Sequence, residues 1–247
     1  MKIIVYDSMS SIRARMERGE RQLLRGILMD ANRVGVVPIF VWDAPGGVAK
    51  RRAIFPNYKN RPPSPQGTMA NLELVRECLN YTNCIQARLP GFEADDIIAA
   101  LVDRFPVSEI HTRDGDLAAL GPPCIGVTAK IPAKLVRLYK LTVGDSSDTI
   151  PGVRGFGQKA WDAADMDCLR HIIDAVLFDQ NWSDEKALGA GLSKSAINWL
   201  RENAALLRVM EQVIAPLPMS DAELDSAITK GTPNIKALEA ILSRNLL

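Results

Sequence analysis

Three expected strands, each ending at or just before an aspartate, constrain the fold of this chain most. The strands are Lys2–Tyr6 and Val36–Trp42, which are strongly apolar, and Val107–Thr112, and the aspartates are Asp7, Asp43 and Asp114. Segments with helical spacing of apolar residues lie between them, at about 12–34, at about 68–81 and from residue 93 onward. Strands that alternate with helices predict a parallel sheet. Ligands bind beyond the carboxyl ends of such strands, so we expect the three aspartates on one rim.

Acidic residues also gather in three short clusters at expected element boundaries. The clusters are Glu93-Ala94-Asp95-Asp96, Asp114-Gly115-Asp116 and Asp145-Ser146-Ser147-Asp148. Helix capping explains one or two acidic residues in a first helical turn, but it does not explain a second cluster after the next strand. Crowded carboxylates repel one another and resist desolvation, and hard divalent cations are an economical counter-charge. The clusters therefore predict metal-dependent phosphoryl-transfer chemistry, with two ions roughly 3.5–4 Å apart.

A basic arm follows Asp43. The chain carries a formal charge of only +1, but no acidic residue occurs between Asp43 and Glu73. The basic residues there are Lys50, Arg51, Arg52, Lys59 and Arg61, with Phe55 and Tyr58 among them. Bases stack on aromatic rings while lysine and arginine hold phosphates, so the arm favours a nucleic-acid substrate. A solvated loop is the alternative interpretation.

Composition excludes several classes of protein. Hydrophobic residues make up 47% of the 247 residues, which is enough for a folded core. Four widely spaced cysteines without a CxxC pair, and only two histidines, argue against a zinc site and favour reduced packing cysteines. No apolar run approaches the roughly 20 residues that span a bilayer, and the first apolar run is too short for a signal peptide. We expect a soluble, cytoplasmic protein.

The character of the chain changes near residue 135. Strand signals stop there, and the remainder reads as helices. A glycine-rich segment, Gly152 to Lys159, directly follows the third acidic cluster. Glycines at a turn that enters a helix let backbone amides approach a phosphate, and Arg154 and Lys159 add positive charge. The sequence therefore predicts a second nucleic-acid contact in a helical region.

Four segments together resemble the 5′-nuclease family, the flap endonucleases and 5′→3′ exonucleases of bacteria and phages, whose module also forms the amino-terminal domain of bacterial DNA polymerase I. Residues 55–63 resemble the family's Tyr-Lys arch motif. Residues 91–96 resemble its Glu-Ala-Asp-Asp motif, and residues 112–117 its Asp-x-Asp-Leu motif. Residues 141–160 resemble its Gly-Asp…Ser-Asp-Asn-x-Pro-Gly-Val…Gly-x-Gly-x-Lys segment. The segments occur in family order over most of the chain.

The resemblance implies an α/β fold with a mainly parallel central sheet flanked by helices, the PIN-like 5′-nuclease core. It implies that residues 1–135 form this catalytic core, with a basic arch at about 44–75. Residues 136–247 would form a helical, helix-hairpin-helix-like DNA-binding region. The implied activity is Mg²⁺-dependent hydrolysis of DNA, and of RNA primers, near 5′ ends, flaps or nicks in replication and repair. The implied cofactors are two Mg²⁺ ions, with Mn²⁺ as a substitute, and K⁺ at the glycine-rich turn.

Site residues follow from the resemblance, motif by motif. The implied metal-binding residues are Asp7, Asp43, Glu93, Asp95, Asp96, Asp114, Asp116, Asp145 and Asp148. The implied catalytic residues are Lys59, Asp116 and Glu93. The implied DNA-binding residues are Lys50, Arg51, Arg52, Tyr58, Lys59, Arg61, Arg154, Gly155, Gly157 and Lys159. The expected partner is DNA with a 5′ end, flap or nick, or an RNA–DNA hybrid, and we expect a monomer without membrane association in a bacterial or phage-infected cell.

The sequence departs from the family pattern at three places. One residue separates Lys59 from Arg61 where the family has two, Ala119 replaces a glutamine, and Thr149 replaces the asparagine after Ser-Asp. None of these changes removes an implied metal ligand, so we expect activity to survive. Two alternatives remain open, a PIN-like ribonuclease and a non-catalytic protein that binds DNA junctions.

Overall fold

The computed structural model describes residues 1–17, 23–60, 66–127 and 131–245. Backbone contacts divide the chain into two compact units. The first, here called the α/β unit, comprises Met1–Gly47, Pro62–Ala129 and Leu217–Leu247. The second, here called the helical unit, comprises Val48–Arg61 and Lys130–Pro216. Each unit is described by itself.

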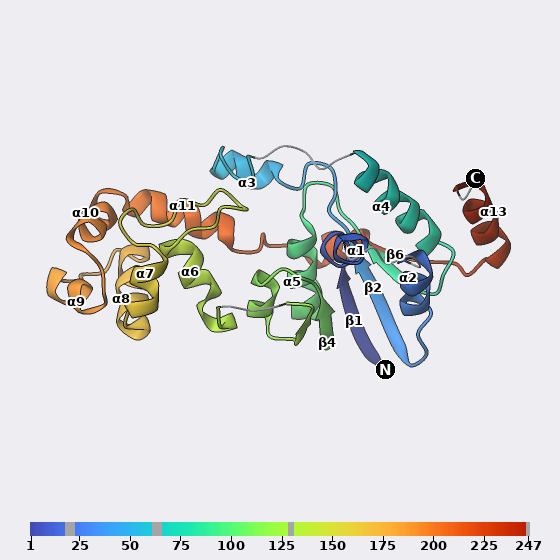
Figure 1. Ribbon diagram of the computed structural model, residues 1–247, viewed down its shortest axis with the longest axis horizontal. Coiled ribbons are helices and arrows are strands. Elements are labelled where there is room, and N and C mark those ends of the chain that lie inside the picture. The colour runs from blue at the N-terminus through green and yellow to red at the C-terminus, as the bar shows by residue number, and fades with distance from the viewer. Residues whose placement is uncertain (18–22, 61–65, 128–130, 246–247) are drawn as a thin grey trace. The chain divides into compact units, whose positions relative to one another are not determined.

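The α/β unit is built on a six-stranded sheet in the order β5-β4-β1-β2-β3-β6. The strands are β1 (Lys2–Asp7), β2 (Val36–Val41), β3 (Ile85–Ala87), β4 (Val107–His111), β5 (Cys124–Ile125) and β6 (Ile228–Lys230). All neighbouring pairs are parallel except β3 with β6. β1 lies between β4 and β2, and Figure 1 shows β1 and β2 as adjacent arrows. The predicted mainly parallel sheet is confirmed.

Helices cover both faces of this sheet because side chains alternate along each strand. The helices of the unit are α1 (Ser8–Glu17), α2 (Leu23–Ala31), α4 (Gln66–Leu79), α5 (Ala94–Arg104), α12 (Asp221–Ala227) and α13 (Ile235–Asn245), with a 3₁₀ turn η1 (Asp116–Leu120). Val5 packs in a buried cluster with Ile97 and Leu101 of α5. Its neighbours Ile4 and Tyr6 pack in a separate cluster on the side of α1, α2 and α4. Burial on both faces explains why β1 and β2 are continuously apolar.

The helical unit contains eight short helical segments among the described residues. They are α3 (Ala49–Ile54), η2 (Ala133–Leu135), α6 (Val136–Thr142), α7 (Gln158–Ala163), α8 (Met166–Leu177), α9 (Asp184–Gly189), α10 (Lys194–Glu202) and α11 (Ala204–Ile214). Three begin at side chains that accept backbone N–H bonds, namely Asp165 before α8, Ser183 before α9 and Ser193 before α10. Such N-caps satisfy donors that a helix leaves without partners.

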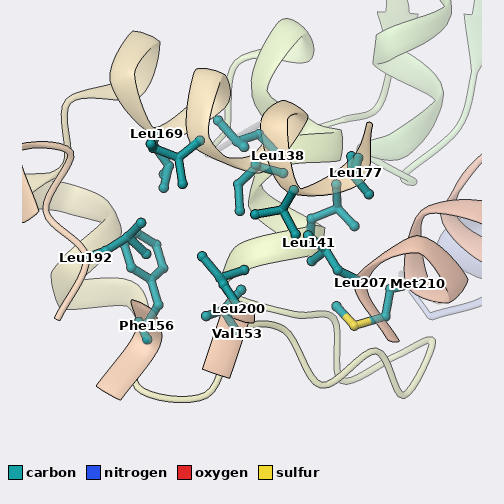
Figure 2. Close-up of a cluster of buried hydrophobic side chains, with 14 of the residues drawn as sticks. Leu138, Leu141, Val153, Phe156, Leu169, Leu177, Leu192, Leu200, Leu207 and Met210 are labelled. Atoms are coloured by element: carbon teal, nitrogen blue, oxygen red, sulfur yellow. The ribbon is translucent and has the colours of Figure 1, made fainter. Parts of the chain in front are cut away.

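A single buried cluster holds the helical unit together. Figure 2 shows Leu138 and Leu141 of α6, together with side chains of α8, α10 and α11, converging on a common interior. Val153 and Phe156 enter the same cluster from the glycine-rich segment. Apolar burial of this kind is the main force that stabilises short helices, which are marginal alone in water.

The structure differs from the sequence expectations in several places. The described part of the expected helix at 12–34 is helical, in α1 and α2, and residues 18–22 between them lie outside the described residues. The expected irregular arm contains α3. Residues 217–247 group with the α/β unit and include strand β6, whereas we expected helices of the DNA-binding region up to residue 247. A strand of three residues is too short to show a period in the sequence. Cys168 is exposed, unlike buried Cys78 and Cys84, and all four cysteines are free thiols.

No helix in the described part of the chain is both long enough and apolar enough to cross a membrane.

Candidate metal centre and nucleic-acid interface

Asp7 is the central carboxylate of the sheet rim, because it ends the strand that lies between β4 and β2. Only 5% of Asp7 is exposed. The hydroxyl of Thr112, just after β4, donates to Asp7 Oδ2 at 2.7 Å and accepts the backbone N–H of Asp114 at 2.9 Å. The backbone N–H of Ser10 donates to Asp7 Oδ1 at 3.2 Å. Thr112 therefore links the carboxylate at the end of β1 to the acidic turn after β4.

The electrostatic surroundings of Asp7 disfavour its ionised form. The pKa of Asp7 is raised to about 6, chiefly by burial and also by the negative charges of Asp43 and Asp114, while the hydrogen bonds from Thr112 and Ser10 act in the opposite direction. Like charges and desolvation both act against the carboxylate. Asp43 and Asp114 thus each lie close enough to Asp7 for their charges to act on it. We call Asp7, Asp43, Glu93 and Asp114 the carboxylate rim.

Asp43 connects the rim to the start of helix α5. Its Oδ1 accepts the backbone N–H of Ala94 at 2.8 Å. The loop after Asp43 packs tightly on the turn before α5, because a Cβ at Gly47 would lie 2.8 Å from the carbonyl oxygen of Phe92 and 3.2 Å from Glu93 Cγ. Only glycine fits that approach. The loop and the helix start therefore hold Asp43 beside Glu93.

Glu93 and Asp96 form a capping box at the start of α5. Asp96 Oδ2 accepts the backbone N–H of Glu93 at 3.0 Å, and Asp96 Oδ1 accepts the N–H of Leu217 at 2.8 Å. Asp96 is 0% exposed. Because backbone donors engage both of its oxygens, Asp96 acts here as a positioning residue for the helix start, and we leave it out of the proposed direct metal ligands.

The raised pKa of Asp7 leads to a prediction about stability without metal. A carboxyl whose pKa is higher in the folded state than its unfolded value near 4 destabilises the fold when it is ionised. This penalty is full above about pH 6 and disappears below about pH 4. Asp7→Asn should therefore raise the free energy of unfolding in EDTA at pH 7.5 by up to about 3 kcal/mol, with the gain vanishing by pH 4.

Urea unfolding of the two proteins between pH 4 and pH 8 measures this difference. Asp103→Asn is the matched control, because Asp103 is an exposed carboxylate near the other end of α5. The control should show no gain that depends on pH. A lower stability of Asp7→Asn at pH 7.5 would contradict the raised pKa.

Asp145 and Asp148 lie in a tight hairpin of the helical unit. Asp145 and Ile150 exchange two backbone hydrogen bonds of 2.8 Å, and the flanking Gly144 and Gly152 touch back to back, where a Cβ would lie 2.6 Å from neighbouring backbone. The Lys140 ammonium lies 2.7 Å from Asp145 Oδ2 and 3.0 Å from Asp148 Oδ2. A nearly buried lysine of α6 therefore supplies the counter-charge to this acidic pair.

Lys140 helps to lower the pKa of Asp145. Burial, the largest single influence, raises the pKa of Asp145, but hydrogen bonds from Lys140 and Ser147 outweigh burial, so that the pKa lies below its ordinary value. Asp145 is ionised at neutral pH. Lys140 was absent from the residues singled out in the sequence, because a lysine on a helix normally indicates a solvated face. Thr112 was also missed, although it lies inside the Thr-Arg-Asp-Gly-Asp segment.

The basic arm is partly buried, contrary to the expectation of an open nucleic-acid surface. Arg51 is only 3% exposed, and its guanidinium donates to the carbonyl oxygens of Val213 at 3.0 Å and Ala215 at 3.2 Å. Tyr58 is also 3% exposed and belongs to the core of the helical unit. A buried ring offers no face to a nucleotide base. We therefore remove Arg51 and Tyr58 from the proposed DNA contacts.

A substitution separates the structural role of Arg51 from a role in DNA binding. Arg51→Ala leaves two carbonyl groups without their donor and removes the guanidinium that lies 5.6 Å from the centre of the Tyr58 ring. We expect the free energy of unfolding to fall by about 2–4 kcal/mol. Chemical denaturation measures it, and Lys50→Ala, at an exposed neighbour, should change stability by less than about 0.5 kcal/mol. Equal losses from both variants would contradict this assignment.

The remaining basic residues of the arm lie nearer the surface. Lys50 and Arg52 are exposed, and Lys59 is half-buried. Arg52 donates to the carbonyl oxygens of Tyr58 and Lys59 at 3.0 and 2.9 Å. The Lys59 ammonium lies 3.7 Å from Asp148 Oδ1. Arg61 lies outside the described residues.

The glycine-rich turn presents the residues expected to contact DNA. Val153 and Phe156 anchor it in the core, while Arg154, Gly155, Gly157 and Lys159 are exposed. Gly155 has φ +87°, and a Cβ there would lie 3.1 Å from Ser195 Oγ. The exposed backbone at Gly155 can therefore approach a phosphate closely.

Two further predicted metal ligands lie in the α/β unit. Asp95 and Asp116 are half-buried, in the first turns of α5 and η1.

Comparisons with known proteins agree with this arrangement. Residues 19–140 match the family described as 5′-3′ exonuclease, N-terminal resolvase-like domain. The thermostable DNA polymerase I of Thermus thermophilus is 30% identical over 253 aligned positions, which cover 91% of this chain and 27% of the polymerase. The 5′-3′ exonuclease of Aquifex aeolicus is 30% identical over 142 positions, which cover 49% of each protein. The chain thus spans at most about half the length of these relatives.

A structural relative shares the fold. The flap endonuclease of bacteriophage T5, in a pseudo-enzyme–product complex with DNA and metal ions, aligns with a TM-score of 0.53 and 14% identity. The alignment covers 98% of each chain. The sequence matches, the shared fold and the acidic segments at the carboxyl ends of the parallel strands all agree. The chain belongs to the 5′-3′ exonuclease family, which includes the 5′-nuclease domain of DNA polymerase I.

Proposed function

We propose that this chain is a Mg²⁺-dependent 5′ nuclease that hydrolyses DNA phosphodiesters near 5′ ends, flaps or nicks. The observation that supports it most is the carboxylate rim, where three neighbouring parallel strands bring Asp7, Asp43 and Asp114 together. A rim of this kind destabilises the protein unless it serves a ligand. The family to which the chain belongs supplies the reaction class.

The donor set of the rim fits a hard divalent cation. Carboxylate oxygens are the ligands that Mg²⁺ prefers, and Mg²⁺ keeps several waters and takes few protein ligands. Burial and the neighbouring negative charges raise the pKa of Asp7, and a divalent cation offsets both of these costs. We propose Asp7, Asp43, Glu93, Asp95, Asp114 and Asp116 as the residues of the α/β unit that hold the metal, directly or through water. Asp145 and Asp148 are proposed as further acidic ligands from the helical unit.

Each group of residues has a distinct task in the proposed reaction. When bound, Mg²⁺ would polarise the phosphate and lower the pKa of a bound water. Thr112 orients Asp7 by its hydrogen bond of 2.7 Å, and Asp96 fixes the helix start that carries Glu93. Lys59 would place its ammonium on an oxygen of the scissile phosphate and stabilise the charge that develops there.

The DNA contacts of the proposal follow exposure and charge. Lys50, Arg52, Arg154 and Lys159 would hold backbone phosphates, because they are exposed cations. Gly155 and Gly157 would let the backbone approach the duplex. These groups would contact the phosphate backbone and not the edges of the bases. We therefore expect DNA affinity to depend on DNA structure and salt concentration more than on base sequence.

A substrate panel tests the proposal. The protein is incubated with 5′-flap, nicked and blunt DNA duplexes, single-stranded DNA and single-stranded RNA, each with Mg²⁺ or with EDTA. We expect cleavage near the 5′ end of flap or nicked DNA in Mg²⁺ and none in EDTA. Cleavage confined to RNA would favour the PIN-like ribonuclease. Tight binding to flap DNA without cleavage of any substrate would favour the junction-binding protein and refute the nuclease.

A further inference from the structure

Two residues with unusual backbone angles face each other in the helical unit. Lys59 has φ 47° and Thr149 has φ 58°, and among the described non-glycine residues only Asp179 also has a positive φ. A β-branched residue such as threonine is strongly disfavoured in this region. Strain of this kind persists only where surrounding contacts require the conformation. The contacts of Thr149 therefore indicate what its conformation is for.

Those contacts bind the turn that carries Lys59. The Thr149 hydroxyl has two acceptors for its one proton, the carbonyl oxygen of Asn57 and that of Asp148 at 2.6 Å, and it accepts the backbone N–H of Asn60 at 3.4 Å. The Lys59 N–H donates to the carbonyl oxygen of Asp148 at 3.1 Å. The hydroxyl thus bridges the residues on either side of the Tyr58-Lys59 pair.

Both partners of this contact are anchored in the same unit. Thr149 belongs to the hairpin that is closed by the Asp145–Ile150 bonds, and Lys140 holds the adjacent Asp148. On the other side, the Tyr58 ring is buried in the core, directly before Lys59 in the chain. The buried Tyr58 ring therefore fixes one side of the Lys59 turn, and the Thr149 hydroxyl fixes the other. The Thr149 hydroxyl therefore joins the turn to the acidic hairpin, beside the ion pair of 3.7 Å between the Lys59 ammonium and Asp148 Oδ1.

We propose that Thr149 is a positioning residue for Lys59. Its hydroxyl fixes the conformation of the turn from which the Lys59 ammonium would reach the phosphate. The positive φ of Thr149 is the conformation that places the hydroxyl on this turn. The inference rests on the proposed function, in which Lys59 contacts the scissile phosphate. It also accounts for the hydroxyl at this position, because a side chain without a polar atom would leave the Asn57 and Asn60 groups without this partner.

Cleavage by a set of variants tests the proposal. Thr149→Val keeps the shape but removes the hydroxyl, Thr149→Ser keeps the hydroxyl, and each is made with Lys59 intact and with Lys59→Ala. Single-turnover rates and Kd are measured on 5′-flap DNA in Mg²⁺. We expect Thr149→Val to lower the rate about tenfold, the equivalent of one hydrogen bond, with Kd unchanged. Thr149→Ser should recover most of that loss, and Thr229→Val, at an exposed site on β6, is the control.

The double variant gives the decisive comparison. If Thr149 acts through Lys59, Thr149→Val has no further effect once Lys59 is alanine. Independent losses that multiply, or a full rate in Thr149→Val, would overturn the proposal while the wild type still cleaves. A wild type that cleaves no substrate would instead refute the proposed function and this inference with it.

Amide hydrogen exchange supplies a readout that does not depend on activity. The Lys59 amide donates to the carbonyl oxygen of Asp148, and the Asn60 amide is shared between the carbonyl oxygen of Asn57 at 3.2 Å and the Thr149 hydroxyl at 3.4 Å. Thr149→Val should speed exchange at both amides at least several-fold, while amides in helix α8 keep the wild-type rate. Unchanged exchange at Lys59 and Asn60 would overturn the positioning role, whatever the cleavage rates.

Discussion

Asp7→Asn should abolish DNA cleavage while it makes the metal-free protein more stable. Asparagine keeps the shape and the acceptor oxygen that Thr112 requires, but it removes the charge at the centre of the carboxylate rim. Loss of a metal ligand removes several kcal/mol of transition-state stabilisation, which corresponds to a rate reduction on the order of a thousandfold. Removal of a buried charge, and with it the repulsion from Asp43 and Asp114, acts in the opposite direction on stability.

The combination of the two effects is the informative result. A residue that is only structural loses stability and activity together, whereas a binding site holds unfavourable charge for the sake of its ligand. Cleavage of 5′-flap DNA under single-turnover conditions gives the rate, and fluorescence anisotropy in Ca²⁺ gives the DNA affinity, which should stay within about twofold because phosphate contacts dominate it. Asp103→Asn should behave as the wild type. Full activity in Asp7→Asn would remove Asp7 from the metal centre.

Lys59→Ala should slow cleavage about a hundredfold and leave DNA affinity nearly unchanged. One fixed positive group at a developing charge contributes about this much to a rate, because it needs no reorganisation during the reaction. The backbone of Lys59 is fixed by its bond to the Asp148 carbonyl and by buried Tyr58 next to it, which supports such a fixed role.

Single-turnover rates in saturating Mg²⁺ measure the effect of Lys59→Ala. Lys236→Ala removes an equivalent charge from an exposed site on α13 and serves as the control. Lys59→Ala also removes the cation 3.7 Å from Asp148, so the Mg²⁺ dependence is measured for each protein. A fall in affinity with an unchanged rate would assign Lys59 to general DNA binding instead.

The sheet and its rim could be predicted from the sequence for a simple physical reason. Strands buried on both faces are continuously apolar, and a charged residue ends such a run abruptly. The carboxyl ends of parallel strands share one edge, so Asp7, Asp43 and Asp114 were expected to meet there before any geometry was known. Their mutual effect on the pKa of Asp7 agrees with that expectation.

Contacts between distant segments could not be predicted in this way. Arg51 bonds to carbonyl groups more than 160 residues later in the chain. In the sequence it is one more cation in a basic run, and nothing local distinguishes it from exposed Lys50. Tyr58 is a similar case, because an aromatic residue among charges fits a nucleotide-stacking surface and a core anchor equally well.

Lys140 and Asp96 show a second limit of the sequence. Lys140 belongs to a helix whose other polar residues give no sign that its ammonium faces Asp145 and Asp148. Asp96 fits the acidic motif, yet the backbone N–H groups of Glu93 and Leu217 use both of its oxygens. Residue type and spacing predicted which carboxylates belong to the region, whereas the hydrogen bonds decide which of them are left for a metal.

The dependence of 5′-flap cleavage on Mg²⁺ shows whether the carboxylate rim is a metal centre. Wild-type protein is stripped with EDTA, and the initial rate is measured as Mg²⁺ is added back, in parallel with Asp7→Asn and Asp103→Asn. We expect no cleavage without metal, a saturable rise for the wild type and Asp103→Asn, and no rise for Asp7→Asn. Cleavage by the wild type that persists in EDTA would contradict a metal centre at the carboxylate rim. Cleavage by Asp7→Asn at the wild-type rate, at the same Mg²⁺ concentration, would contradict it too.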